Sequence, residues 1–448
     1  MPVVESALLN AFRPGAPLDD PFLFAGRRDQ IIELAQNLHV EGVCPIIYGA
    51  RGLGKTSLAL QVQRIAMGDV TLLEDYEERQ WALGGDETYL AFYIPCSDST
   101  RDTPSILQRI INSLSSITTD DSTEPTELVD LTTQKRITLK IFQAETSKRY
   151  QVPQASPTYD DLALDEKLLD LASGLSETYQ HRVLVIIDEL DVVRNTSGLA
   201  SFIKNASSID LKFLLVGIGQ NVSSLLSDHQ SIERIGVPVR VPGMTERELS
   251  LIIERSMEKL AELGVDYSFN RSSSGILVRL ASGFPWFVHV LGQSALLAAH
   301  KANRTIVISD DVRYAARSLV DNRFAQQFRD LYLTAVGDSW QREAVLRTFA
   351  LWPSQDIPTG DIYRVLRRIG VAYPSSHVSQ LSSDSYASIF MRPPLQRRGI
   401  VRFANEMFKV YVKVRRPLFD VDGKIQDAWR IEFFGTEFAD DAEPIVPP

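Results

Sequence analysis

The first half of the chain alternates between short apolar runs and longer segments in which apolar residues recur at helical spacing. The apolar runs VCPIIYG, TYLAFYIPCS, RVLVIIDELDVV and LKFLLVGIG have the length and continuity of buried strands. Helices are predicted after Gly26, from Lys55 to Met67, and over SILQRIINSLSSI and DDLALDEKLLDLASGLSETYQ. Strands that alternate with helices in this way predict a parallel α/β sheet up to Pro242.

Two segments depart from this alternation. Residues 1–20 are rich in Pro and Gly and predict an extended arm. Residues 118–157 are rich in Thr, Ser, Asp and Glu, and RITLKIFQAETSKRYQV within them reads as two alternating strands around a polar turn. We expect this segment to be an insertion on the α/β core.

Helical patterns dominate from Pro242 to about Val336. Thr245 and Glu248 match the capping box T-x-x-E at the start of the first helix. The last part of the chain gives three short helical patterns, and GIVRFANEMFKVYVKVRRPLF then reads as two strands around a turn at Ala404–Glu406. The expected domains are therefore an α/β core at 1–243, a helical lid at 244–337 and a winged helix with a tail at 338–448.

Composition limits the classes of function. The chain has 448 residues and a net charge of −10, so a nucleic-acid site would have to be a local basic patch. Its two cysteines, Cys44 and Cys96, adjoin apolar runs and are interpreted as buried apolar residues. The N-terminus lacks the pattern of a signal peptide, and no apolar run is long enough for a membrane span. We expect a cytoplasmic protein without a membrane partner.

A glycine-rich segment carries the strongest chemical signal. It matches G-x-x-x-x-G-K-[ST] at every fixed position, follows a predicted strand and opens a predicted helix. Backbone N–H groups of such a loop surround phosphate oxygens, while Lys55 reaches the β- and γ-phosphates and Thr56 binds Mg²⁺. The candidate nucleotide-binding residues of this loop are Gly49, Ala50, Arg51, Gly52, Leu53, Gly54, Lys55, Thr56 and Ser57.

A second signal agrees with the first. The buried run VLVIIDE delivers Asp188 to the carboxyl end of a predicted strand, where open α/β sheets bind ligands. Asp188 is a candidate Mg²⁺ ligand, and Glu189 is a candidate catalytic residue that polarises the attacking water. Asp191 is interpreted as a solvated or outer residue of the same acidic cluster.

Two further polar positions follow the strand LKFLLVGIG. Gln220 would lie between the two motifs and sense the γ-phosphate. Arg234 is either a catalytic finger that reaches a phosphate across a subunit interface or a surface arginine that caps a helix. Both alternatives for Arg234 remain open at this stage.

Between Pro21 and Phe434 the chain resembles prokaryotic AAA+/STAND-type P-loop ATPases near the origin-recognition initiator branch. GARGLGKTS and VIIDELD resemble the Walker pair, and the strand Thr88–Ser97 between them along the chain resembles the added strand of the ASCE class. PFLFAGRRDQI resembles an entry box, VGIGQNVSSLLSDHQSIER a sensor-one segment, and SGFPWFVHVLG a G-x-P element. The resemblance implies ATP and Mg²⁺ as cofactors, a homo-oligomer as an alternative to a monomer, and adenine-side contacts from Phe24, Gly26 and Arg27, with Gly283 and Pro285 near the nucleotide.

The last domain is locally basic. Residues 342–416 hold 13 Arg and Lys against 5 Asp and Glu. The candidates for contact with nucleic acid are Arg397, Arg398, Arg402 and Lys413. The alternative is an intramolecular clamp, in which these residues dock on acidic parts of the same chain, as the winged helix of STAND proteins does.

The sequence thus predicts an ATP-binding, ATP-hydrolysing protein and leaves two biological roles open. The first is a molecular switch that controls a separate effector or regulatory protein, for example in prokaryotic antiviral defence. The alternative is a DNA-binding AAA+ ATPase of the initiator or transposition-loader type. A metabolic kinase is disfavoured because no cluster of arginines for a substrate phosphate is evident.

Overall fold

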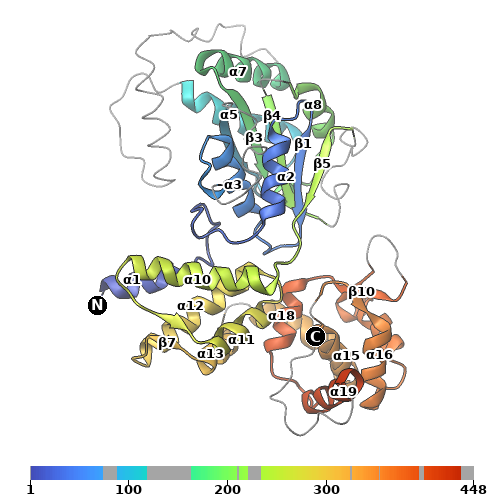
Figure 1. The fold of residues 1–448 in the computed structure, drawn as a ribbon. Coiled ribbons are helices and arrows are strands. Elements are labelled where there is room, and N and C mark those ends of the chain that lie inside the picture. Colours follow the sequence, from blue (N-terminus) through green and yellow to red (C-terminus); the bar gives the residue numbers. More distant parts are fainter. Residues whose placement is uncertain are drawn as a thin grey trace. The chain divides into compact units, whose positions relative to one another are not determined.

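The computed structural model describes residues 2–73, 88–118, 163–208, 211–219, 234–322, 325–352, 354–392 and 398–434 (Figure 1). The predicted insertion and its hairpin lie outside these residues beyond Thr118. The chain forms two compact units. One comprises residues 28–49 and 55–241, and the other comprises residues 1–27, 50–54 and 242–448.

The first unit is built on a five-stranded sheet in the order β2-β3-β4-β1-β5. Every neighbouring pair of strands is parallel, which confirms the predicted parallel α/β core. The strands are β1 Cys44–Gly49, β2 Tyr89–Pro95, β3 Arg182–Asp188, β4 Leu211–Ile218 and β5 Gly236–Arg240. Residues 183–188 are all buried, as expected for a strand covered on both faces.

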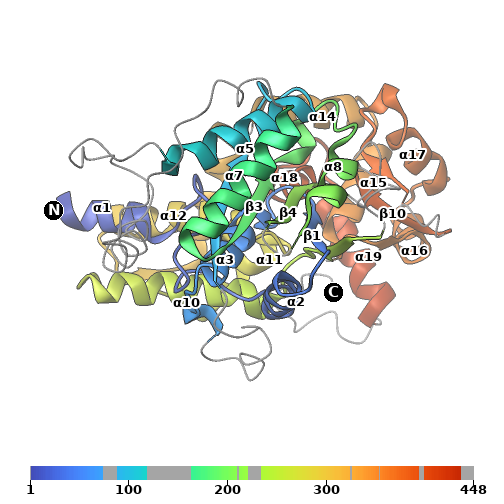
Figure 2. The ribbon, with the colours of Figure 1, turned by 90° about the horizontal axis from the view of Figure 1, so that it is seen from above.

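Helices cover both faces of this sheet (Figure 2). The first unit contains α2 Arg28–Leu38, α3 Lys55–Ala66, α5 Thr103–Thr118, α7 Leu164–Tyr179 and α8 Leu199–Ala206, with the short 3₁₀ helices η1 Thr71–Leu73 and η3 Leu190–Val192. Val183, Val185 and Ile187 alternate along β3 and share one core with α5, α7 and α8. Cys44 and Cys96 are buried in the same core as free cysteines, as predicted.

The order of the strands in the sheet differs from their order along the chain. The strand between the two motif strands β1 and β3 is β4, which follows both of them along the chain. The predicted strand Thr88–Ser97 forms as β2, but it lies at the edge of the sheet beside β3. Order along the chain does not determine order in a sheet whose strands are joined by crossover connections.

The second unit contains a helical part after Pro242, in agreement with the prediction. Its elements are α10 Glu246–Glu262, α11 Arg271–Ala281, α12 Pro285–Lys301, α13 Ser309–Asn322 and α14 Ala325–Val336, with a parallel pair of short strands, β6 Ser268–Phe269 and β7 Ile306–Val307. The predicted capping box is present, because Thr245 accepts from the Glu248 backbone while the Glu248 side chain accepts from the Thr245 backbone.

The predicted extended arm is wrong, because residues 2–11 form helix α1 Pro2–Ala11. This helix packs on α10 and α12. Leu8 is fully buried, and Phe12 lies so close to α12 that a β-carbon built on Gly292 would be 2.7 Å from its ring. The apolar residues of this segment therefore gain more from burial on the lid than its Pro and Gly content suggested.

The C-terminal part contains α15 Trp340–Leu351, β8 Ile357–Pro358, α16 Thr359–Arg368, α17 Pro374–Leu381, η5 Asp384–Tyr386, β9 Phe390–Met391, β10 Ile400–Phe403, α18 Glu406–Val414 and α19 Asp422–Phe434. The three short helices predicted here are α15, α16 and α17. Strand β10 pairs antiparallel with both β8 and β9.

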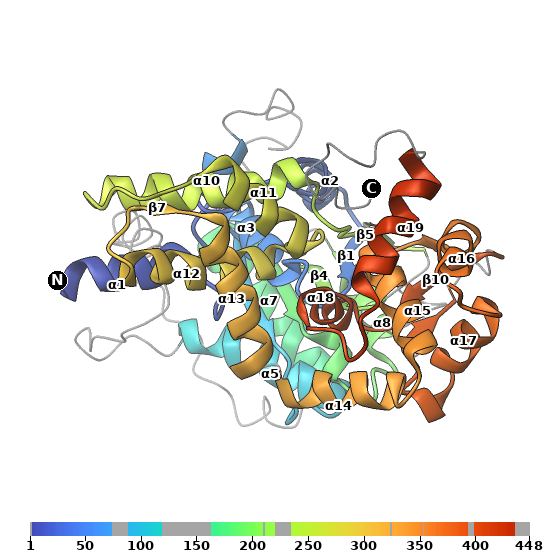
Figure 3. The same cartoon turned by 90° about the horizontal axis from the view of Figure 1, so that it is seen from below.

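The predicted second strand after Ala404 is wrong, because this segment is helix α18. Asn405 caps it by accepting a hydrogen bond from the Phe408 backbone. The helix contacts α11, α13, α14 and α15 (Figure 3), so residues 408–412 are all buried. The charged residues Glu406, Lys409 and Lys413 recur at helical spacing, but the alternation of Val410, Val412 and Val414 was misread as a strand.

Within the described ranges, no helix has the length and apolar character needed to cross a membrane.

Candidate functional site

The two motifs of the sequence meet at one edge of the parallel sheet. Gly49 is the last residue of β1 and Asp188 the last residue of β3. Since the strands are parallel, their carboxyl ends lie on the same side, where ligands bind in open α/β sheets. Lys55 begins α3 and is buried. The helix N-terminus thus follows the glycine-rich loop, as a phosphate site requires.

The loop between β1 and α3 needs its glycines for backbone conformation. Gly52 and Gly54 have φ values of +79° and +85°, a region that residues with a β-carbon rarely adopt. A β-carbon built on Gly54 would lie 3.8 Å from Cγ of Pro285, and one on Gly52 would lie 3.7 Å from Cδ1 of Phe284. The predicted G-x-P element therefore reaches the tip of the loop within the second unit.

A tyrosine that belongs to neither motif binds one of the candidate Mg²⁺ ligands and lies beside the other. The hydroxyl of Tyr93, on β2, donates a hydrogen bond to Oδ2 of Asp188 over 2.7 Å. The side chain of Thr56 lies beside the same phenol. The other carboxylate oxygen of Asp188 accepts from the backbone N–H of Glu189 over 2.6 Å. The side-chain oxygens of Thr56, Tyr93 and Asp188 thus gather at one place on the sheet edge.

The phenol of Tyr93 is held in its protonated form. Burial and then the charge and hydrogen bond of Asp188 raise the pKa of Tyr93 above its ordinary value. The group is therefore a hydrogen-bond donor at neutral pH. In the sequence, Tyr93 is one of two tyrosines four residues apart in an apolar strand, and nothing in the pattern shows which of them faces the site.

Glu189 follows Asp188 in a strained backbone conformation. Its φ is +56°, which is uncommon for a residue with a β-carbon, and its side chain is exposed. The turn is fixed by the Val192 backbone, which donates to the Glu189 carbonyl over 3.1 Å. Asp191 accepts from the backbone N–H of Ile218 over 2.6 Å and so ties this turn to the end of β4. The turn directs the Glu189 carboxylate away from the buried core.

The residues at this edge fit a magnesium ion. Mg²⁺ prefers oxygen ligands and usually keeps several waters while it binds one or two protein groups and substrate phosphates. The hydroxyl of Thr56 and the carboxylate of Asp188 supply hard oxygen donors, and both lie beside the Tyr93 phenol. Both belong to the first compact unit.

The predicted entry box has a structural role in the second unit. The buried guanidinium of Arg27 donates to the carbonyls of Pro242 and Leu53, over 2.6 and 3.0 Å. Burial lowers the pKa of Arg27 to about 10. Arg27 therefore fastens the tip of the glycine-rich loop to the start of the lid. That Phe24, Gly26 and Arg27 contact adenine stays a prediction.

Glu248 completes this arrangement from α10. Its Oε1 accepts from the Arg27 backbone N–H over 3.0 Å, in addition to its role in the capping box. Burial alone would raise the pKa of Glu248, but the hydrogen bonds from Arg27 and Thr245 outweigh burial and lower it. A β-carbon on Gly26 would lie 2.4 Å from Glu248 Oε1, so only glycine fits there.

The remaining candidates are scattered. Gln220 and Arg397 lie outside the described residues. Arg234 and Arg398 are exposed. Arg402 forms an ion pair with Asp356, and Lys413 donates to Oγ of Ser282 over 2.5 Å.

Much of the positive charge in the C-terminal part is likewise paired inside the chain. Arg347 is buried in an ion pair with Asp422, and Arg364 and Arg368 pair with Glu432. Four exposed arginines have no ion pair among the described residues: Arg367, Arg392, Arg398 and Arg416.

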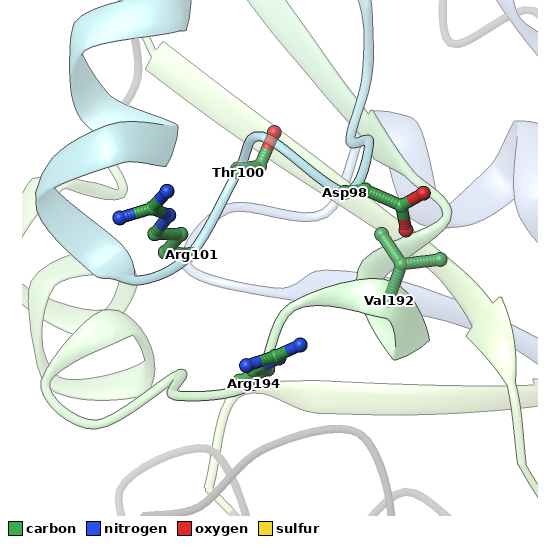
Figure 4. Close-up of a pocket in the computed structure, with 5 residues that line it drawn as sticks. All are labelled: Asp98, Thr100, Arg101, Val192 and Arg194. Carbon is green, nitrogen blue, oxygen red and sulfur yellow. The ribbon is translucent and has the colours of Figure 1, made fainter.

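A separate pocket of about 570 Å³ lies beyond the ends of β2 and β3 (Figure 4). It is lined by Asp98, Thr100, Arg101, Val192 and Arg194. The segments after the two strands are held together because the Asn195 backbone donates to the Arg101 carbonyl and Thr103 donates to the Ser197 carbonyl. None of the candidate residues from the sequence lines this pocket.

No family model and no curated protein matches the sequence. Similar solved structures include Cdc6p from Pyrobaculum aerophilum, with 15% identity, a TM-score of 0.41 and coverage of 90% of this chain and 97% of that one. The ORC2 protein of Aeropyrum pernix, solved as ADPNP-ADP complexes, has 18% sequence identity and a TM-score of 0.45, and the match covers 90% of this chain and 94% of that one. The ORC1 protein of Aeropyrum pernix, solved in complex with DNA, has 14% sequence identity and a TM-score of 0.44, and the match covers 92% of this chain and 95% of that one. At these identities and TM-scores, function has to be argued from the residues of this chain.

Proposed function

We propose that this chain is a P-loop ATPase that binds ATP with Mg²⁺ and hydrolyses it. The observation that carries the proposal is the meeting of the two motifs at the carboxyl edge of the sheet. There, Asp188 from β3 accepts a hydrogen bond from the Tyr93 phenol, and Thr56 at the start of α3 lies beside the same phenol. This edge is where open α/β sheets bind their ligands, and the strand–loop–helix context is the one that the glycine-rich motif requires.

Each residue then has a defined task. The backbone N–H groups of the glycine-rich loop and the N-terminus of α3 bind phosphate oxygens, and Lys55 adds a positive charge beside them. Thr56 and Asp188 would hold Mg²⁺, which when bound neutralises charge on the β- and γ-phosphates. Glu189 orients and polarises the attacking water from its exposed position after Asp188.

Nucleotide binding is tested with Lys55→Ala. Thermal unfolding is measured with and without ATP and Mg²⁺, and linkage predicts about 2.7 kcal/mol of stabilisation of the wild-type protein at a hundredfold excess over Kd. We expect the variant to lose this shift. Lys204→Ala, which removes an exposed lysine from α8 of the same unit, is the matched control and should keep it. An equal shift in Lys55→Ala and wild type would refute the site.

DNA binding through the C-terminal part is the second candidate function. The order of α15, β8, α16 and α17, followed by β9 and β10, is the order of a winged helix, which supports the proposed DNA-binding module. Arg392 and Arg398 are exposed on either side of the β9–β10 connection, and Tyr373 before α17 is 82% exposed. Exposed arginines and an exposed aromatic ring suit contact with phosphates and bases.

Oligomerisation and partners follow as finer proposals. Arg234 lies exposed in the turn before β5, and in a homo-oligomer it could serve a nucleotide bound to a second copy. A separate effector protein and a role in antiviral defence have no supporting observation among the described residues, and we do not propose them.

A further inference from the structure

One hydroxyl group on β2 holds the carboxylate at the end of β3. The hydroxyl of Tyr93 donates to Oδ2 of Asp188 over 2.7 Å, and Thr56, at the start of α3, lies beside the same phenol. Tyr93 is in register with Ile186 on the neighbouring strand, two residues before Asp188. Its side chain therefore reaches the carboxylate from the adjacent strand rather than from either motif.

We propose that Tyr93 is a positioning residue of the Mg²⁺–nucleotide site, which sets the orientation of the Asp188 carboxylate. This inference rests on the proposed function. No motif of the sequence includes Tyr93.

The hydrogen bonds of Asp188 show what the phenol achieves. Asp188 is buried, and each of its oxygens already accepts one bond, from Tyr93 and from the Glu189 backbone. These two bonds fix the carboxylate against rotation. Partners that orient metal ligands in this way typically change metal affinity by about 10–100-fold when they are removed.

The test is Tyr93→Phe, which keeps the ring and removes the hydroxyl. Binding of a fluorescent ATP analogue is titrated with Mg²⁺, and its affinity is also measured in EDTA. We expect the half-saturating Mg²⁺ concentration to rise by about tenfold or more. We expect the affinity in EDTA to stay within about twofold of wild type, because the phenol acts on a metal ligand, Asp188. A purely structural role would weaken binding equally in both conditions.

Tyr89→Phe is the matched control on the same strand. The Tyr89 hydroxyl donates to the Leu38 carbonyl over 2.5 Å and is buried, so its removal also deletes one hydroxyl from β2. This variant should keep the wild-type half-saturating Mg²⁺ concentration within about twofold. Tyr93→His, which retains a ring with a hydrogen-bonding group, should lie between wild type and Tyr93→Phe, and it serves as the test if the phenylalanine variant fails to fold.

Three outcomes would overturn the inference. The half-saturating Mg²⁺ concentration of Tyr93→Phe could be unchanged or lower, its affinity could fall equally in EDTA, or Tyr93→His could lose as much as Tyr93→Phe. Absence of any nucleotide binding by the wild-type protein would instead refute the proposed function, and the inference would fall with it.

Discussion

The Nζ of Lys413 donates a hydrogen bond to Oγ of Ser282 over 2.5 Å, and this bond joins α18 to the residue that ends α11. Ser282 immediately precedes Gly283, the first residue of the G-x-P element. Burial, with a smaller contribution from the charge of Lys409, lowers the pKa of Lys413 to about 7. The lysine predicted to contact phosphates is thus engaged inside the second unit.

The depressed pKa of Lys413 predicts a specific pH dependence. Between pH 7 and about 10.4 the unfolded chain keeps this proton while the folded chain loses it, so stability should rise with pH across that window. Burial raises the pKa of Glu406 to about 6, so this carboxyl group titrates below the window that begins at pH 7. We expect Lys413→Met to remove a slope of up to about 1.4 kcal/mol per pH unit. Urea unfolding at pH 7 and 9.5 measures this, with Lys301→Met as the exposed control; parallel pH profiles of wild type and Lys413→Met would contradict it.

Arg27→Met should destabilise the fold more than it weakens nucleotide binding. The substitution leaves the carbonyls of Pro242 and Leu53 without their donor and removes the charge beside Glu248. The loss of a buried, hydrogen-bonded charge costs about 3 kcal/mol or more. Chemical denaturation measures this loss, and Arg28→Met, the exposed neighbour, is the control. Normal stability with lost affinity for ATP would show instead that Arg27 serves the nucleotide.

Glu189→Gln should separate ATP binding from hydrolysis. The amide keeps the shape of the side chain but cannot polarise water, so turnover should fall at least tenfold, a barrier increase of about 1.4 kcal/mol. The thermal shift with ATP and Mg²⁺ should persist. Phosphate release and thermal unfolding measure the two quantities, and Asp98→Asn, an exposed acid in the neighbouring pocket, is the control. Unaltered turnover would show that a residue other than Glu189 polarises the attacking water.

The double variant Arg392→Ala, Arg398→Ala tests DNA binding. If both arginines contact phosphates, DNA affinity should fall steeply with salt, and the slope of log affinity against log salt concentration should be about −0.9 per contacted phosphate. The slope of the double variant should then be shallower than that of the wild type by up to about 2. Fluorescence anisotropy at several salt concentrations measures the slope. Lys259→Ala, Arg313→Ala removes the same charge from the lid as a control. No measurable binding by wild type would leave the intramolecular clamp as the better account of the basic residues.

The sheet could be predicted because its strands are continuously apolar, and the glycine-rich loop because its residue types are fixed by phosphate chemistry. Helix α18 was missed because Val410, Val412 and Val414 alternate as they would in a strand, which obscured the helical spacing of Glu406, Lys409 and Lys413. Helix α1 was missed because its partner surface on α10 and α12 lies far along the chain.

The site was predictable only where it follows a motif. Asp188 and Thr56 belong to known spacings, whereas Tyr93 acts through the pairing of β2 with β3, which no local pattern encodes. The structural role of Arg27 similarly depends on carbonyls that come from two distant segments, at Leu53 and Pro242.

The docking of α1 on α10 and α12 has a consequence for biosynthesis. The helix leaves the ribosome before α10 and α12, and Gly292, against which Phe12 packs, is made 280 residues after Phe12. At about 5–20 residues per second, roughly 14–56 s of translation separate the two. During that interval the apolar side chains of Leu8 and Phe12 lack their partners on the lid, so the nascent α1 segment is a candidate client for ribosome-associated chaperones.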